Sequence, residues 1–321
     1  MVPPFERASR VDFILEAIKG SGLGDICAPK AFSLEYVLAV HDPNFVEFLS
    51  TVWEDWQATG YQGEAVPNVW PARRMQQRVP SFIEGKLGYY AMAAETSISA
   101  GTWTAALAAK DVALTGAQHL LQGETGVFSL CRPPGHHAAK DMFGGYCFLN
   151  NAAIAAQYLV EQSNQRVAVL DIDFHHGNGT QDIFYNRNDV LFCSLHGEPE
   201  EAFPHFLGYA DETGSGAGLG FNCNYPLPRG TSFHDWYQSL EQALDKITAF
   251  APTFLVVSLG VDTFENDPIS FFQLTSADFS RVGQRLGDTG LPTLFVMEGG
   301  YDVAEVGTNV VNVLREFARG V

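Results

Sequence analysis

The stretch VAVLDIDFHHGNGTQDIFY, residues 167–185, decides the fold and locates a candidate site. It opens with a short apolar, β-branched run, Val167–Leu170, of the kind that forms a buried strand. Asp171, Asp173 and His175 follow at every second position, so in an extended chain their side chains point to one side. Converging buried charges of like sign are unfavourable unless a cation neutralises them. The stretch therefore predicts a strand that ends in a cation site.

Several similar apolar runs recur along the chain and predict further strands. With the first run they cover Thr125–Cys131, Arg166–Ile172, Asp189–His196, Thr253–Gly260 and Pro292–Gly300. They are apolar throughout, as expected of strands covered on both faces. Helical patterns over Asn150–Gln162, Phe233–Phe250 and Thr275–Gly290 lie between them, and Ser276 is expected to cap the last helix. This alternation predicts an α/β fold: a doubly wound, mainly parallel sheet flanked by helices.

Ligands of such sheets bind beyond the carboxyl ends of the strands. The loops CRPPGHH, DFHHGNG, VDTFEND and EGGYD all follow predicted strands. Asp262, in the third loop, joins Asp173 and His175 to make two carboxylates and one imidazole. Catalytic zinc sites use three protein ligands and keep a position open for water, whose pKa then falls to about 7. Asp262 alone would be taken for a turn or helix-capping residue, but the combined pattern favours a metal site.

A histidine pair and a tyrosine follow two other strands. His136 and His137 lie in RPPGHH, an extended Pro-Gly segment that cannot be helical. Such a pair can take a proton from water and give one to a leaving amine. Asp171 is the natural partner of one histidine, because a carboxylate raises an imidazole pKa. Tyr301 follows two glycines that let the backbone bend, so its phenol is either an oxyanion donor or a residue packed on the rim.

For two segments the sequence does not decide between a functional and a structural interpretation. DMFGGYCFLNN places Gly145, Tyr146 and Phe148 after the histidines, either as a narrow apolar slot for an alkyl chain or as an ordinary loop-to-helix junction. Residues 60–90 contain three prolines and little periodicity. They predict an insert loop that is either an interaction element or a decorative insertion. No repeat or linker divides the chain, so residues 1–321 are expected to form a single domain.

The net charge of −18 limits the kinds of molecule that this chain is expected to bind. Nucleic-acid binders usually carry a basic face, and an anionic membrane would repel this chain, whereas a cationic ligand would be attracted. Solubility alone is the favoured explanation for most of this negative charge. The five cysteines include no CxxC pair, which predicts reduced thiols and a cytoplasmic location. Neither a signal peptide nor an apolar run of the ~18 residues that span a membrane is found.

The motifs RPPGHHA, GYCFLNNAAIAA, LDIDFHHGNGTQDIFY, SLGVDTF and MEGGYD together resemble the zinc histone-deacetylase-like branch of the arginase–deacetylase superfamily. Within that branch, SLGVDTFENDPISFF, NYPLPRGT and the insert with PARRM are most similar to acetylpolyamine amidohydrolases. The resemblance implies the arginase–deacetylase fold and zinc-dependent hydrolysis of acetylated polyamines to acetate and free amine. The alternative is a deacetylase of acetyl-lysine proteins or other small acylated amines. Arginase-like two-metal hydrolysis would need further carboxylates, and a non-catalytic acylamine-binding protein would often lack Tyr301 or a ligand.

The resemblance also implies roles for single residues. Zinc would be held by Asp173, His175 and Asp262, and the residues that act on the substrate or on the histidines would be His136, His137, Tyr301, Asp171 and Asn178. Some relatives have an aspartate in place of Asn178. An amide cannot raise an imidazole pKa by charge, so His137 should stay neutral while His136, beside Asp171, carries charge. A potassium ion would lie near Asp171, Ser194 and Leu195.

Substrate and partner contacts follow from the same resemblance. Gly145 with Tyr146 or Phe148 would wall the channel for the acyl chain. Glu95 would grip the substrate at the mouth of the channel, and Glu84 would help to meet the ammonium groups of a small cationic acetylated amine. The insert would narrow the mouth and pack against a second subunit, giving a homodimer. Relatives usually begin with a strand ahead of a segment like PPFERASR, so a truncated or misassigned start is expected here.

Overall fold

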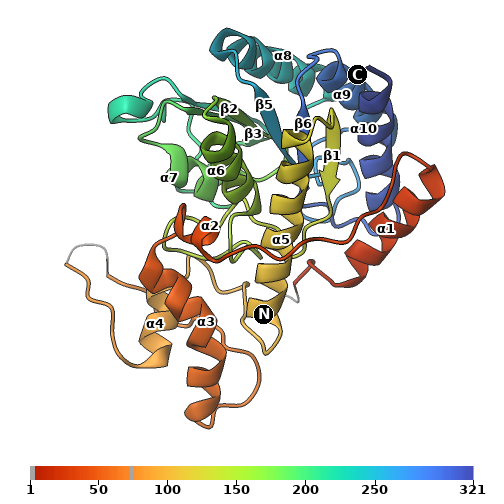
Figure 1. Ribbon diagram of the computed structural model, residues 1–321. Helices are drawn as coiled ribbons and strands as arrows, with labels where there is room; N and C mark the ends of the chain where they lie inside the picture. The colour runs from red at the N-terminus through yellow and green to blue at the C-terminus, as the bar shows by residue number, and fades with distance from the viewer. Residues whose placement is uncertain (1–3, 73–75, 321) are drawn as a thin grey trace.

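A six-stranded, wholly parallel sheet forms the centre of the computed structural model, which describes residues 4–72 and 76–320 (Figure 1). In spatial order the strands are β1 (Gly126–Ser129), β6 (Thr293–Met297), β5 (Phe254–Leu259), β2 (Val167–Asp171), β3 (Val190–Gly197) and β4 (Asn222–Leu227). All five predicted strands are confirmed to within a few residues. The sequence patterns missed β4, a strand at the sheet edge that is only partly buried and contains Pro226.

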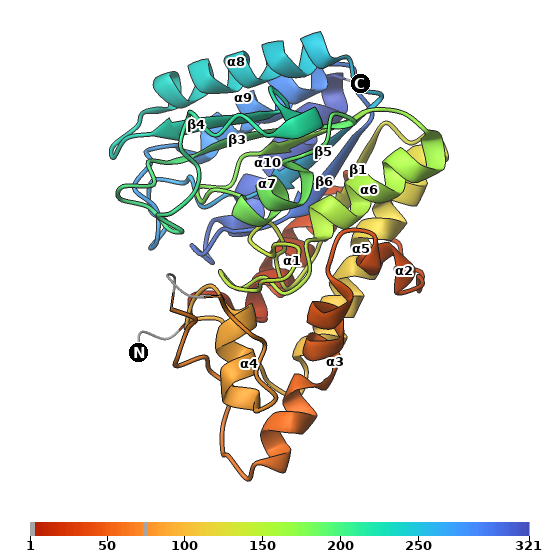
Figure 2. The ribbon, with the colours of Figure 1, turned by 90° about the vertical axis from the view of Figure 1, so that its left-hand side faces the viewer.

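Helices cover both faces of the sheet (Figures 1 and 2). The helices of the described residues are α1 (Ser9–Ser21), α2 (Glu35–Leu38), α3 (Pro43–Ala58), α4 (Ile83–Tyr90), α5 (Thr102–Leu121), α6 (Asn151–Ser163), α7 (Asn178–Phe184), α8 (Phe233–Phe250), α9 (Ser276–Gly287) and α10 (Val306–Gly320). Alternate residues of β2 enter two different cores: Val167 and Val169 belong to the core that includes residues of α5 and α6, whereas Ala168 and Leu170 belong to the core that includes residues of α8, α9 and α10. The doubly wound arrangement is confirmed.

The start of α9 differs by one residue from the prediction. Thr275, not Ser276, is the capping residue, so the predicted cap is wrong. The reason is Asp278, whose carboxylate accepts hydrogen bonds from the Thr275 backbone N–H at 2.8 Å and from its hydroxyl at 2.7 Å. This reciprocal capping pattern selects the threonine three residues ahead of the acid.

The insert at residues 60–90 is only partly a loop. Ile83–Tyr90 forms α4, so the loop prediction is wrong for the last quarter of the segment. The preceding chain crosses this helix very closely, because a Cβ added at Gly88 would lie 1.5 Å from the Val69 carbonyl oxygen. The Trp70 indole donates a hydrogen bond to the Ala91 carbonyl at 2.9 Å. Together with α3, α4 forms an arm that stands away from the sheet (Figure 2).

The free edge of β1 borders a cavity of about 740 Å³. Parts of α1, α5 and α10 and the chain between Leu23 and Pro29 line this cavity. It contains none of the candidate site residues, which all lie elsewhere in the fold. Among the described residues, no helix combines the length and apolar character needed to cross a membrane.

Candidate metal and acid–base site

The candidate site lies at the carboxyl end of the sheet, as the sequence predicts. Asp171 is the last residue of β2, and Asp173 and His175 follow in the next loop. Asp262 follows β5, and Tyr301 follows β6. Because these strands are parallel neighbours, their carboxyl ends meet at one edge and bring these side chains together.

Three predicted metal ligands form a buried cluster. The ligand atoms of Asp173, His175 and Asp262 all lie within 4.8 Å of one another. His175 Nδ1 lies 3.2 Å from Asp173 Oδ1 and 3.0 Å from Asp262 Oδ2. Neither carboxylate is exposed, and His175 is 8% exposed. Two oxygens and one nitrogen facing a common point make a donor set that suits zinc with a position left open.

Glycines allow the backbone to close around the carboxylates. The Gly299 N–H donates to Asp173 Oδ2 at 2.7 Å. A Cβ at Gly299 would lie 2.5 Å from an oxygen of both Asp173 and Asp262, and one at Gly260 would lie 2.2 Å from Asp173 Oδ2. Side chains at these two positions would therefore displace the ligands, and the glycines of SLG and EGG shape the cradle.

The charges of the cluster also fit a cation. Burial opposes a charge on His175, but hydrogen bonds and attraction to Asp173 and Asp262 outweigh it and raise its pKa to about 9. Burial and the nearby Asp173 charge raise the pKa of Asp262 to about 6. Two buried carboxylates thus draw a proton onto the histidine to balance their charge. A divalent cation would supply the same compensation and release that proton.

The two neighbouring histidines have opposite electrostatic surroundings. His136 Nδ1 donates to Asp171 Oδ2 at 2.9 Å, and His137 Nδ1 donates to Asn178 Oδ1 at 2.7 Å, so both predicted partners lie in contact. Burial lowers the pKa of His136, but Asp171 and the other nearby carboxylates outweigh it and raise the value to about 10. Burial, followed by the positive charges of its histidine neighbours, lowers the pKa of His137 well below its usual value. His137 is therefore the neutral member of the pair.

Glu298, which the sequence interpretation missed, holds the histidine segment in place. Its Oε2 accepts hydrogen bonds from the backbone N–H groups of Gly135 at 2.6 Å and His136 at 3.1 Å. The side chain is fully buried, and burial raises its pKa to about 7. Glu298 belongs to the motif MEGGYD. Its position at the end of a predicted strand was the signal that could have identified it as a site residue.

Tyr301 is held from two sides. Its backbone N–H donates to Asp267 Oδ2 at 2.7 Å. The Arg10 guanidinium lies 4.7 Å from the ring centroid and donates to the carbonyls of Gly300 and Glu298, each at 2.7 Å. Burial raises the pKa of Tyr301 well above its usual value, so its phenol keeps its proton and can donate. The sequence interpretation missed Arg10 and Asp267.

The predicted slot residues Gly145 and Tyr146 lie beside the histidines. Gly145 has a φ of 56°, and a Cβ there would lie 2.2 Å from the His137 ring, so glycine is needed both for the turn and for the close approach. Tyr146 also has a positive φ, of 67°. Its ring lies edge-on to Tyr301, with the centroids 5.9 Å apart.

The aromatic side chain next to the histidines is Phe203 rather than Phe148. Phe148 is 7% exposed and stacks on Phe143 within the core. This packing does not favour the position in the channel wall that was expected for Phe148. Phe203 lies edge-on to His137, with ring centroids 5.0 Å apart, and is only half-buried. It comes from an irregular segment before α8, where no periodic signal could point to it.

Glu95 and Glu84 have different surroundings. Glu95 is half-buried and accepts hydrogen bonds from the Gly145 N–H at 3.0 Å and the Thr96 hydroxyl at 3.2 Å. Glu95 thus lies beside the predicted slot and stabilises the turn at Gly145. Glu84 lies in the first turn of α4, where its hydrogen bond raises the pKa of the Tyr61 phenol. Among the described contacts, none joins Glu84 to the histidines.

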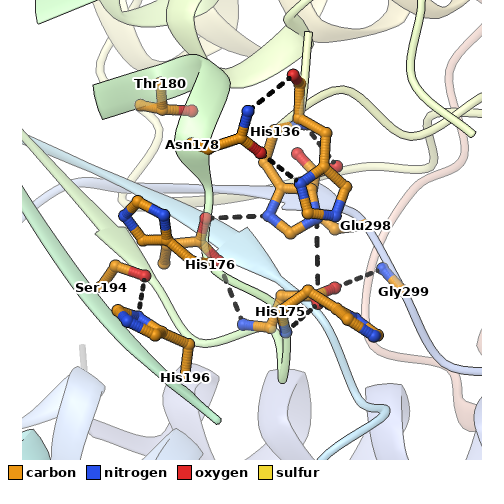
Figure 3. A network of polar contacts seen from close by, with 12 residues as sticks. His136, His175, His176, Asn178, Thr180, Ser194, His196, Glu298 and Gly299 are labelled. Carbon is orange, nitrogen blue, oxygen red and sulfur yellow. Dashed lines mark hydrogen bonds and ion pairs between the residues drawn. The ribbon is translucent and has the colours of Figure 1, made fainter. Parts of the chain in front are cut away.

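The residues predicted to lie near potassium are neighbours in the sheet. Ser194 is the register partner of Asp171 on the adjacent strand, and Leu195 follows it, fully buried. The Ser194 hydroxyl lies 2.8 Å from His196 Nδ1 (Figure 3). The structure therefore places Asp171, Ser194 and Leu195 next to one another on two adjacent strands.

A parallel α/β sheet with a buried Asp-His-Asp cluster beside a charged and a neutral histidine defines a metal-dependent hydrolase. The chain belongs to the histone deacetylase domain family, which matches residues 4–317, so the resemblance seen in the motifs is confirmed.

Individual relatives narrow this assignment. The chain is 56% identical to the acetylpolyamine amidohydrolase of Mycoplana ramosa, over 99% of this chain and 93% of that protein. It is 55% identical to acetylpolyamine amidohydrolase 2 of Pseudomonas aeruginosa, over 98% and 92%. The crystal structure of acetylpolyamine aminohydrolase from Burkholderia pseudomallei superposes with a TM-score of 0.93 at 38% identity, covering 98% of this chain and 91% of that one.

Proposed function

We propose that this protein hydrolyses the acetyl amide of acetylated polyamines and releases acetate and the free amine. The observation that carries the proposal is the cluster of Asp173, His175 and Asp262 beside the neutral His137. The high identity to acetylpolyamine amidohydrolases supports the substrate class. An acidic chain, with a net charge of −18, also suits a cationic substrate. Deacetylation of acetyl-lysine proteins is less favoured by these relatives.

We assign the following roles to the site residues. Asp173, His175 and Asp262 would hold zinc, which when bound polarises the amide carbonyl and makes water acidic enough to ionise near neutral pH. His137 carries its proton on Nδ1, because the Asn178 oxygen can only accept, so Nε2 is free to take a proton from the attacking water. The same nitrogen then gives that proton to the departing amine.

His136 and Tyr301 complete the proposed mechanism. His136 stays charged beside Asp171 and stabilises negative charge that develops during the attack. The protonated Tyr301 phenol donates to the carbonyl oxygen, which acquires negative charge as its carbon becomes tetrahedral. Gly145, Tyr146 and Phe203 would form a narrow slot for the alkyl chain, and Glu95 would lie at its mouth.

Further parts of the proposal concern a second ion and the assembly. Potassium would bind near Asp171, Ser194 and Leu195, where a monovalent cation would offset the buried carboxylate. A homodimer would form through the insert, which carries a set of exposed apolar side chains: Tyr61, Val69, Trp70, Val79 and Phe82. We also propose that residues 1–321 form one domain and that the enzyme acts in the cytoplasm, where its five cysteines would stay reduced.

A substrate panel on zinc-reconstituted protein tests the proposed function. Acetylspermidine, acetylputrescine and an acetyl-lysine peptide are compared by kcat/KM, with acetate release as the readout. We expect the acetylated polyamines to exceed the peptide by roughly tenfold or more, which corresponds to about 1.4 kcal/mol in transition-state binding. A preference for the peptide would favour the protein deacetylase, and no acetate release from any substrate would refute the hydrolase.

A further inference from the structure

A pair of cysteines lies away from the candidate site, on neighbouring strands. Cys193 of β3 and Cys223 of β4 are register partners in a parallel ladder. Their side chains point to the same face, because both pack with the core that α8 covers. Strands in a sheet lie about 4.8 Å apart. That spacing falls within the Cα separations that a disulfide can span.

The two thiols differ in their exposure to solvent. Cys193 is fully buried, whereas Cys223 is half-buried on the edge strand of the sheet. The two thiols lie within hydrogen-bonding contact of each other. An oxidant would therefore reach the more accessible thiol, that of Cys223, first, with the Cys193 thiol directly behind it.

We propose that Cys193 and Cys223 form a peroxide-sensitive dithiol that closes to a disulfide between β3 and β4. In the first step the Cys223 sulfur attacks a peroxide oxygen, the O–O bond breaks, and a sulfenic acid and one water form. In the second step the Cys193 sulfur attacks the oxidised sulfur, and the hydroxyl leaves with the Cys193 proton as a second water. Two thiols are oxidised by two electrons, and the peroxide is reduced to water.

The bond would also act on the candidate site through β4. The residues that flank Cys223 are Asn222 and Asn224, whose side-chain amides donate to Gln181 Oε1 at 2.9 and 2.8 Å. Gln181 lies on α7, a helix that begins at Asn178, the partner of His137. Drawing β4 toward β3 would move this series of contacts. Small displacements of a proton-transfer group reduce turnover, so we expect kcat to fall by about twofold or more.

Peroxide treatment of the folded, zinc-loaded protein tests the proposal. A Cys27→Ser background removes the exposed thiol. After hydrogen peroxide and alkylation of the remaining thiols, peptide mapping should find a Cys193–Cys223 cross-link that dithiothreitol removes. Recovery of both cysteines in alkylated form, under conditions that oxidise a free thiol standard, would overturn the proposal. Full cross-linking with an unchanged kcat would overturn the proposed effect of the disulfide on the candidate site.

Two variants show whether the pairing is specific. In Cys193→Ser, Cys223 should stop at the sulfenic acid and be trapped by dimedone. In Cys131→Ser, which removes a buried cysteine of the other core, the cross-link should form as before. A cross-link of Cys223 to another cysteine in the Cys193→Ser protein would contradict the assigned pair. Because the test concerns the thiols, its failure would leave the proposed hydrolase untouched.

Discussion

The carboxyl end of the sheet and the insert at residues 60–90 differ in what surrounds their side chains. At the sheet end, buried polar groups have partners on several sides: Asp173 accepts from the backbone of His175 and Gly299, and Asp262 accepts from Phe174. The insert instead leaves large apolar side chains in solvent, with Val69 and Phe82 each 54% exposed. The metal ligands of the first region are held by backbone N–H groups and lack only a cation, and the second region lacks a covering surface.

This difference implies a separation of tasks. Substitutions at the sheet end should abolish chemistry or metal binding while leaving assembly intact. Substitutions in the insert should change assembly while leaving the metal and the histidines intact. Four predictions test this separation, from the largest expected effect to the smallest.

Asp262→Asn should have the largest effect. The variant keeps the volume of the side chain but removes one anionic ligand, so zinc should no longer be retained after dialysis. Because the metal contributes several kcal/mol to the transition state, kcat/KM should fall about 10³-fold. Zinc content by elemental analysis and acetate release are measured together. Glu265→Gln, an exposed carboxylate three residues later, is the matched control and should retain both. Full zinc retention in Asp262→Asn would remove this residue from the ligand set.

Tyr301→Phe should keep zinc and lose turnover. Removal of one oxyanion donor typically lowers kcat about 10²-fold, and the phenylalanine ring still fits the same packing. KM and zinc content should change little. Tyr158→Phe changes a tyrosine buried in the core and serves as the control. If Tyr301→Phe turned over as fast as the unmodified protein, the phenol would be only a packing residue on the rim.

Much of the sheet end could be predicted from the sequence because each part is local. The spacing of Asp171, Asp173 and His175 defines one loop, and the apolar run before it defines the strand. The parallel sheet then joins that loop to Asp262 and Tyr301 through the general position of strand ends. Both histidine partners, Asp171 and Asn178, were likewise found in contact with the expected histidine.

The other features of the site depend on contacts between distant parts of the chain, which no local sequence pattern encodes. Arg10 donates to the carbonyl of Gly300, 290 residues later in the chain, and nothing in its own helix marks it. Phe203 comes from an irregular segment without periodicity. Phe148, by contrast, fits a slot motif in sequence but turns into the core against Phe143. Side-chain direction in loops is set by tertiary packing and therefore escaped prediction.

Asn178→Ala tests whether the amide orients the neutral histidine. Without the acceptor, the His137 ring loses the hydrogen bond that fixes its Nδ1 proton, and kcat should fall roughly tenfold while zinc is retained. Asn178→Asp keeps an oxygen acceptor and should recover part of the lost rate. Stopped assays of acetate release give kcat for both variants. Equal loss in the two variants would argue that Asn178 acts by packing rather than by accepting this hydrogen bond.

Phe82→Glu should have the smallest effect on chemistry and the clearest effect on assembly. A charge on the exposed apolar side of the insert makes burial against a second subunit unfavourable, so light scattering should report a monomer. Zinc content should not change, and kcat should stay within about twofold, because surface substitutions rarely disturb a distant site. Phe13→Glu alters a similarly exposed phenylalanine, 48% exposed on α1, and should leave the oligomeric state as it was. If Phe82→Glu lost zinc or most of its turnover as a well-folded protein, the insert and the sheet end would not be separable, and the insert would have to be counted as part of the site.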